Sequence, residues 1–147
     1  MTIPAFSLSP ELHPAPLSVI GVSITVLATS ASRESGEITL QEGPAGSGPP
    51  PHSHAWDESF YVLKGTVDFE FNGKSGCATP GTLVHLPAGA VHGFRFGTDG
   101  GAMIEITGKN SQATAMFSAI AANMRPGPPD IPAVIRILEQ HGVTVAA

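Results

Sequence analysis

Four side chains that can bind a metal ion lie in two short stretches of this chain. His52 and His54 are separated by one residue, and Glu58 follows four residues later. A third histidine, His92, lies in a second stretch that begins at Gly81. Three imidazoles and one carboxylate are common ligands of a divalent transition ion, and an octahedral ion keeps two positions open for water or substrate. The four residues therefore predict a metal site, provided that the fold brings them together.

The spacing of the first three candidate ligands suits a β-strand. Residues two apart on a strand point to the same face, so the first two histidines share a face and Glu58 keeps their phase. The Pro-Ala-Gly turn at 87–89 stands just before His92 and allows its strand to run antiparallel beside the first. Asp57 is out of phase and is a weaker candidate. We expect no ligand role for His85.

Composition narrows the class of protein. At 147 residues the chain is predicted to form one domain. Charged residues make up only 13%, while 17 glycines and 14 prolines suit many short strands and tight turns. A net charge of −5 provides no basic surface for phosphates, so no nucleic-acid partner is expected. The lone Cys77 excludes an intramolecular disulfide and suits a reducing cytosol, and we expect its thiol to be buried.

An apolar run at residues 17–29 raises the question of a membrane or export segment. The run is too short to span a bilayer. The first basic residue, Arg33, comes after it, so the positive start of a signal peptide is missing. Its apolar residues alternate with Gly, Ser and Thr, as in a half-buried strand. We therefore expect a soluble, cytoplasmic protein without membrane contact.

Turn residues divide the middle of the chain into short strands without intervening helices. Asn72-Gly73 after alternating apolar residues is a typical hairpin turn. The pattern indicates a closed or sandwiched antiparallel all-β architecture. Strands are predicted at 18–28, 37–42, 59–64, 66–71, 83–86, 91–96 and 102–107.

The spacing of apolar residues changes from that of a strand to that of a helix after Thr107. Apolar residues at helical spacing predict an amphipathic helix at about 111–124, and a second helix begins near Pro132 and ends at Gly142. We expect both helices to pack outside the β body or at a dimer contact. The predicted organisation is an N-terminal arm at 1–16, a barrel at 17–108 and a helical extension at 109–147.

The two stretches resemble the paired motifs of the cupins, a family of small β-barrels. The first motif places Gly, His-x-His, Glu and Gly at fixed spacing, and the second places Gly, Pro-x-Gly, His and Asn. The resemblance implies a double-stranded β-helix, or jelly-roll barrel, with one divalent ion (Fe, Mn, Ni, Co or Zn) on the four candidate ligands. The chain matches at Gly46, His52, His54, Glu58 and Gly65, then at Gly81, Pro87, Gly89 and His92, with Phe96 in the place of Asn.

The residues in phase with the ligands are mainly apolar, and Phe96 removes a polar group from the motif. They predict a dry pocket for an apolar molecule that offers one or two metal-binding oxygens. The expected pocket residues are Phe60, Val62, Phe94 and Phe96 in the inward phase, Trp56 and Met103 at the mouth, and Glu105 if it faces inward.

Within the cupins, the sequence from His52 to Gly65 and the segment 126–130 are most similar to the small quercetinase-like group. This resemblance implies a homodimeric, metal-dependent dioxygenase of oxygenated aromatic compounds, with Glu58 as ligand and proton acceptor. Two alternatives stay open: a non-enzymatic cupin that binds a metabolite or sugar through the metal, and a metal-dependent isomerase or lyase. Few polar residues in the inward phase weigh against a sugar, and few acids and bases weigh against an isomerase.

Overall fold

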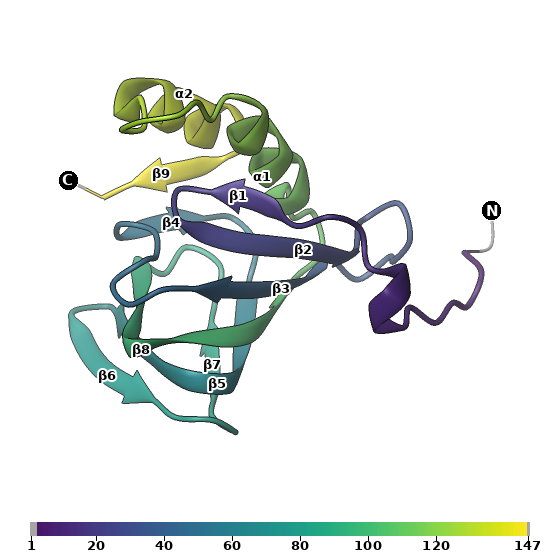
Figure 1. The fold of residues 1–147 in the computed structure, drawn as a ribbon, viewed down its shortest axis with the longest axis horizontal. Coiled ribbons are helices and arrows are strands. Elements are labelled where there is room, and N and C mark those ends of the chain that lie inside the picture. The colour runs from purple at the N-terminus through teal and green to yellow at the C-terminus, as the bar shows by residue number, and fades with distance from the viewer. Residues whose placement is uncertain (1–2, 147) are drawn as a thin grey trace.

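The computed structural model describes residues 3–146, which form a curled antiparallel sheet covered at one end by two helices (Figure 1). A short 3-10 turn at Pro10–Leu12 lies in the N-terminal arm. The helices are α1 (Ala113–Ala122) and α2 (Ile131–Gln140). The strands are β1 (Leu17–Val19), β2 (Val22–Ala28), β3 (Ile38–Gly43), β4 (His52–His54), β5 (Glu58–Phe71), β6 (Lys74–Ala78), β7 (Leu83–Leu86), β8 (His92–Thr107) and β9 (Val143–Val145).

The sheet follows the order β1-β2-β3-β8-β4-β9, and β5 pairs with β6, β7 and β8. All of these pairings are antiparallel. The inward-facing side chains form an apolar core in which Phe60, Val62 and Met103 are almost inaccessible to solvent. The all-β barrel with two C-terminal helices is therefore confirmed.

Two long strands replace four predicted short ones. The segments expected at 59–64 and 66–71 join as β5, and those expected at 91–96 and 102–107 join as β8. The join in β5 depends on Gly65, which has φ +65° next to an irregularity in the register. A Cβ there would lie 2.0 Å from the carbonyl oxygen of Gly100, so only glycine allows this close approach.

Three further features of the sheet differ from the prediction. The run expected at 18–28 is divided into β1 and β2 by a turn at Ile20-Gly21. Strand β6 returns beside β5 after the predicted Asn72-Gly73 turn. The short C-terminal strand β9 pairs with β4, so the last described residues lie against the strand that carries His52 and His54.

Both helices pack on the outside of the β body, which is one of the two predicted placements, while the alternative of a dimer contact stays a prediction. In Figure 1 they lie over the end of the barrel near β1, β4 and β9. Their apolar side chains form one wall of an interior cavity that reaches the candidate ligands. The helical period showed an apolar face on each helix, but it contained no information about what that face covers.

A buried carboxylate fixes α1 to the barrel. Glu37, immediately before β3, is 2% exposed. It accepts hydrogen bonds from the backbone N–H of Thr114 (2.9 Å), from the Thr114 hydroxyl, from the Ser111 hydroxyl (3.3 Å) and from the N–H of Ser30 (3.1 Å). Because Thr114 lies in the first turn of α1, the carboxylate satisfies an N–H group that the helix itself leaves unpaired.

The lone cysteine and two apolar residues of the N-terminal arm are exposed to solvent. Cys77 is exposed on β6, so the expectation of a buried thiol is wrong. Phe6 and Leu12 of the N-terminal arm are 56% and 63% exposed, and the arm extends away from the barrel (Figure 1). Within residues 3–146, no helix is long and apolar enough to cross a membrane.

Candidate metal centre

Three histidines converge at one end of the barrel. The nitrogen atoms that His52, His54 and His92 offer all lie within 4.8 Å of one another. His52 and His54 point the same way from β4, and His52 is the direct antiparallel partner of His92 on β8. The rings of His52 and His92 have centroids 4.4 Å apart. The convergence follows from strand phase and register, as the sequence predicted.

The turn before β8 holds the third histidine in place. Ala90 donates its N–H to the carbonyl oxygen of Pro87 (3.1 Å), and Gly89 has φ +85°, as the third position of a type II turn requires. The N–H of Gly89 also donates to the carbonyl oxygen of His54 (2.8 Å). This bond joins the two motifs directly at the site.

Backbone carbonyls select the tautomer of all three rings. Each Nδ1 lies within hydrogen-bond distance of a carbonyl oxygen, which can only accept. Each Nδ1 therefore carries the proton, and the neutral ring keeps its lone pair on Nε2, as metal-binding histidines do. The carbonyls belong to Pro50 for His52 (2.8 Å), Trp56 for His54 (2.8 Å) and Ala90 for His92 (2.9 Å).

Glu58 completes the cluster. Its side chain is buried, and Oε2 lies 3.0 Å from Nε2 of His54 and 3.5 Å from Nε2 of His92. With Nδ1 protonated, these nitrogens and the carboxylate are all acceptors, so a cation must lie among them to make this proximity favourable. Among the described residues, Nε2 of His92 is buried without a hydrogen-bond partner. The residues present therefore fit a divalent metal ion.

The electrostatics of the metal-free cluster agree with a shared proton. Burial, together with the neighbouring His92, lowers the pKa of His52 to about 4, so this ring is neutral at pH 7. Burial works to raise the pKa of Glu58, but the close imidazoles of His54 and His92 outweigh it and hold that pKa well below its usual range. Burial likewise opposes protonation of His92, yet the Glu58 carboxylate raises the pKa of His92 above its ordinary value. A metal ion that binds here would compete with a proton for the same groups.

A cavity of about 360 Å³ reaches the cluster. Its walls come from β1, β2, the loop at 48–50 and both helices, and they are mostly apolar. Besides His52, His54 and Glu58, the polar side chains in its lining are Gln41 and Glu105. The helical wall consists of Ala113, Met116, Phe117 and Ile120 of α1 and of Ile131, Val134, Ile135 and Leu138 of α2.

Trp56 lines the cavity beside the cluster. Its indole stacks on the His54 ring, with centroids 4.4 Å apart and planes 9° from parallel. The indole N–H is buried and has no acceptor within residues 3–146. Trp56 therefore orients one histidine and lines the cavity beside it.

The other predicted pocket residues divide into two groups. Trp56, Phe94 and Glu105 line the cavity. Phe60, Val62, Phe96 and Met103 are 1% exposed or less and pack in the barrel core, outside the cavity lining.

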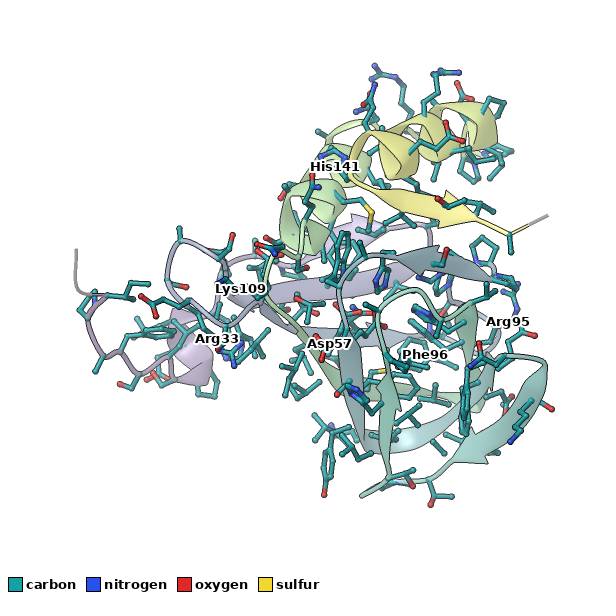
Figure 2. All side chains as sticks on the ribbon, turned by 180° about the vertical axis from the view of Figure 1, so that it is seen from behind. Arg33, Asp57, Arg95, Phe96, Lys109 and His141 are labelled. Atoms are coloured by element: carbon teal, nitrogen blue, oxygen red, sulfur yellow. The ribbon has the colours of Figure 1, made fainter. Side chains whose placement is uncertain are left out.

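Phe96 does not shape the cavity, although the sequence suggested that it would. It lies inside the barrel (Figure 2), with its ring edge-on to Phe94 at a centroid distance of 5.6 Å. Its side chain fills the space beside Gly43 and Gly101, where an added Cβ would lie 2.9 Å from its ring. The apolar character of the cavity comes instead from the helices and the first two strands.

Glu105 is a second buried carboxyl group at the cavity. It lies on β8, 5% exposed, and accepts a hydrogen bond from the Thr39 hydroxyl (3.4 Å), which in turn accepts one from the Gln41 amide (3.2 Å). Burial, followed by the nearby charge of Glu58, raises the pKa of Glu105 well above its ordinary value. The cavity is thus lined by one carboxyl group that favours the charged form and one that favours the neutral form.

Two other candidates lie away from the cluster. His85 is exposed on β7 and shares a hydrogen bond with the Ser59 hydroxyl (2.8 Å). Asp57 is also exposed and packs against Gly108, which donates its N–H to the Asp57 carbonyl oxygen at 2.8 Å (Figure 2). Neither belongs to the histidine cluster.

Comparisons with known proteins agree with this architecture. An RmlC-like cupin from Shewanella frigidimarina superposes with a TM-score of 0.65 at 18% identity, covering 77% of this chain and 99% of that one. KdgF from Halomonas sp. gives 0.63 at 18% identity (69% and 93% covered), and the polyketide cyclase RemF from Streptomyces resistomycificus gives 0.60 at 20% identity (71% and 79%). These likenesses show the fold alone.

No curated protein matches the chain. The sequence model described as "Cupin domain" matches residues 36–106, which include all four candidate ligands. With the barrel, the motif spacing and the histidine cluster, this match identifies residues 36–106 as a cupin domain of the cupin-2 type.

Proposed function

We propose that the protein is a metal-dependent enzyme that acts on a small, mainly apolar, oxygenated molecule, and that the reaction is a dioxygenation of an oxygenated aromatic compound. One observation carries the proposal: the apolar cavity opens directly onto the cluster of His52, His54 and Glu58. Its volume is at the lower end of the range for small-molecule sites. A ligand held there would have its polar end at the histidines and its apolar part against the helices.

The roles of the residues follow from their positions. His52, His54, His92 and Glu58 would hold one divalent ion, which would supply Lewis acidity toward a substrate oxygen. Glu58 is held in its charged form at the end of the cavity, so its carboxylate is placed to receive the proton of a substrate hydroxyl. The apolar walls bind the remainder of the substrate and exclude water from the ion.

A second candidate reaction is a metal-dependent isomerisation or elimination. Such chemistry needs one group that accepts a proton and another that donates one. Glu58 and Glu105 both line the cavity and have pKa values shifted in opposite directions. The sequence analysis included Glu105 only if it faces inward, and its position in the cavity lining now supports this alternative.

The third candidate is a non-enzymatic binding protein, and the cavity lining limits the class of ligand that it would bind. Sugar-binding sites need many hydrogen-bonding side chains, whereas Gln41 and Glu105 are the polar lining residues of this cavity outside the histidine cluster. A binding role would therefore concern an apolar metabolite rather than a sugar.

The experiment is an activity screen on protein loaded with Fe, Mn, Co or Ni. Oxygen consumption is measured against a panel of flavonols and catechols, and product formation is measured again without oxygen. Oxygen-dependent turnover that is lost in Glu58→Gln supports the dioxygenase. Turnover without oxygen that is lost in Glu105→Gln supports the isomerase or lyase. Tight binding without turnover under either condition would contradict an enzymatic role.

A further inference from the structure

Two hairpin turns of this chain have nearly the same backbone and different residues. Between β1 and β2, Ile20 has φ +47° and Gly21 has φ +83°. Between β5 and β6, Asn72 has φ +49° and Gly73 has φ +78°. Positive φ at both central positions is typical of the type I′ turn, for which Asn-Gly is the preferred sequence. The second turn therefore meets the requirement, and the first does not.

Isoleucine is an unfavourable residue for this conformation. In the described part of the chain, the non-glycine residues with positive φ are Ile20, Asn72 and Asn110. Asparagine tolerates this region, whereas a β-branched side chain crowds its own backbone there. The strain at Ile20 must be offset by what its side chain contacts.

The Ile20 side chain lies at the mouth of the cavity. It is half-buried, packs on the edge of the apolar core and belongs to the cavity lining. Two other lining residues, Pro50 and Ile131, are exposed and mark the opening on the loop before β4 and on α2. The turn is close to that loop, because a Cβ added to Gly21 would lie 3.7 Å from Cβ of Ser47.

We infer that Ile20 is a specificity-determining residue, which contacts the apolar end of a ligand whose oxygen atoms bind at the histidines. The inference rests on the proposed function for the orientation of the ligand. A strained turn that projects a branched apolar side chain into a cavity favours longer apolar ligands over shorter ones. Asparagine at this position would relax the backbone and remove that contact.

The test compares Ile20→Asn with the matched control Asn72→Ile, which makes the reverse change in the equivalent turn, whose residues are not part of the cavity lining. Affinities of the Co²⁺-loaded proteins for acetohydroxamate and octanohydroxamate are measured from the cobalt absorption spectrum. Binding of the neutral fluorophore 1-aminoanthracene to the metal-free proteins is measured in parallel. Ile20→Gly serves as a second variant, because glycine also accepts positive φ without strain.

We expect Ile20→Asn to bind octanohydroxamate and 1-aminoanthracene about fivefold or more weakly, with acetohydroxamate affinity unchanged, since only the longer probes bury apolar surface at the mouth. Asn72→Ile should lower the Tm by about 2–8 °C and change none of the three affinities. Unchanged octanohydroxamate and 1-aminoanthracene affinities in both Ile20 variants would overturn the inference, as would equal losses for all three probes. If acetohydroxamate does not change the cobalt spectrum of the wild type, the proposed binding of ligand oxygens at the metal is contradicted instead. The 1-aminoanthracene affinities of the metal-free proteins would still test the role of Ile20.

Discussion

The carboxylate of Glu37 offers a direct test of how the helical cover is held over the cavity. Replacing it with glutamine keeps the shape of the side chain but removes its charge and one of its acceptor oxygens. In the wild type, Oε1 accepts from the N–H of Thr114 and from Ser111, and Oε2 accepts from the Thr114 hydroxyl and the N–H of Ser30. An amide NH₂ in the place of Oε2 would face the N–H of Ser30 and leave it unpaired.

The expected loss of stability follows from these contacts. A hydrogen bond to a charged group contributes about 1.5–3 kcal/mol, and a buried donor left without a partner costs about 1–3 kcal/mol. The Thr114 hydroxyl can rotate and accept from the new amide, and burying an amide costs less than burying a carboxylate. We therefore expect Glu37→Gln to lower the free energy of unfolding by about 2–4 kcal/mol, which lowers the Tm by about 5–15 °C in a chain of this length.

The assay is urea and thermal unfolding of Glu37→Gln and of Glu34→Gln. Glu34 is exposed, so its substitution makes the same change in charge without removing a buried acceptor. The Glu37 variant should also bind 1-aminoanthracene more weakly, because α1 contributes Met116 and Ile120 to the cavity wall. A free energy of unfolding within about 0.5 kcal/mol of the Glu34 variant would refute the argument that this carboxylate anchors α1.

Three further predictions concern the metal and the assembly. His52→Ala or His92→Ala should reduce Co²⁺ affinity at least tenfold, measured by competition with a chelator, while His85→Ala should leave it unchanged. The pKa of His92 is raised, so the metal-free site binds a proton near neutral pH more readily than a free imidazole does. Metal binding therefore releases a proton, and metal affinity falls as the pH is lowered. Calorimetry in buffers of different ionisation enthalpy should detect that proton, and equal apparent enthalpies in all buffers would contradict the prediction. We also propose a homodimer, because Tyr61 (44% exposed) and its strand partner Leu83 (62% exposed) form an apolar patch on the outside of the sheet. Light scattering should show a dimer that Leu83→Glu converts to a monomer. A monomeric wild type would contradict the proposal.

The histidine cluster was predictable because it depends on local rules. Strand phase placed His52 and His54 on one face of β4, and the Pro-Ala-Gly turn brought His92 to the same point. The hairpin at Asn72-Gly73 was predictable for the same reason, since its residues are those that the turn requires. Glu58 reaches the cluster by another route than the predicted strand phase, because the strand breaks at residues 55–57 and Glu58 is the first residue of β5.

The cavity was not predictable because it depends on packing between distant segments. The apolar face of α1 could be identified from its period, but its position depends on Glu37, about 75 residues away, which carries no recognisable motif. Phe96 looked like a pocket residue because it occupies a motif position, whereas β8 directs it into the barrel core. The turn at Ile20 was missed because its residues do not favour the conformation that they adopt.

The most direct test of the metal centre is anomalous diffraction from crystals of the Co²⁺-loaded protein. The account predicts one cobalt ion bound by Nε2 of His52, His54 and His92 and by a carboxylate oxygen of Glu58, at distances of about 2.0–2.2 Å. Positions facing the cavity should remain open to water or hydroxamate. Cobalt bound elsewhere, or held by fewer than three of these histidines, would contradict it.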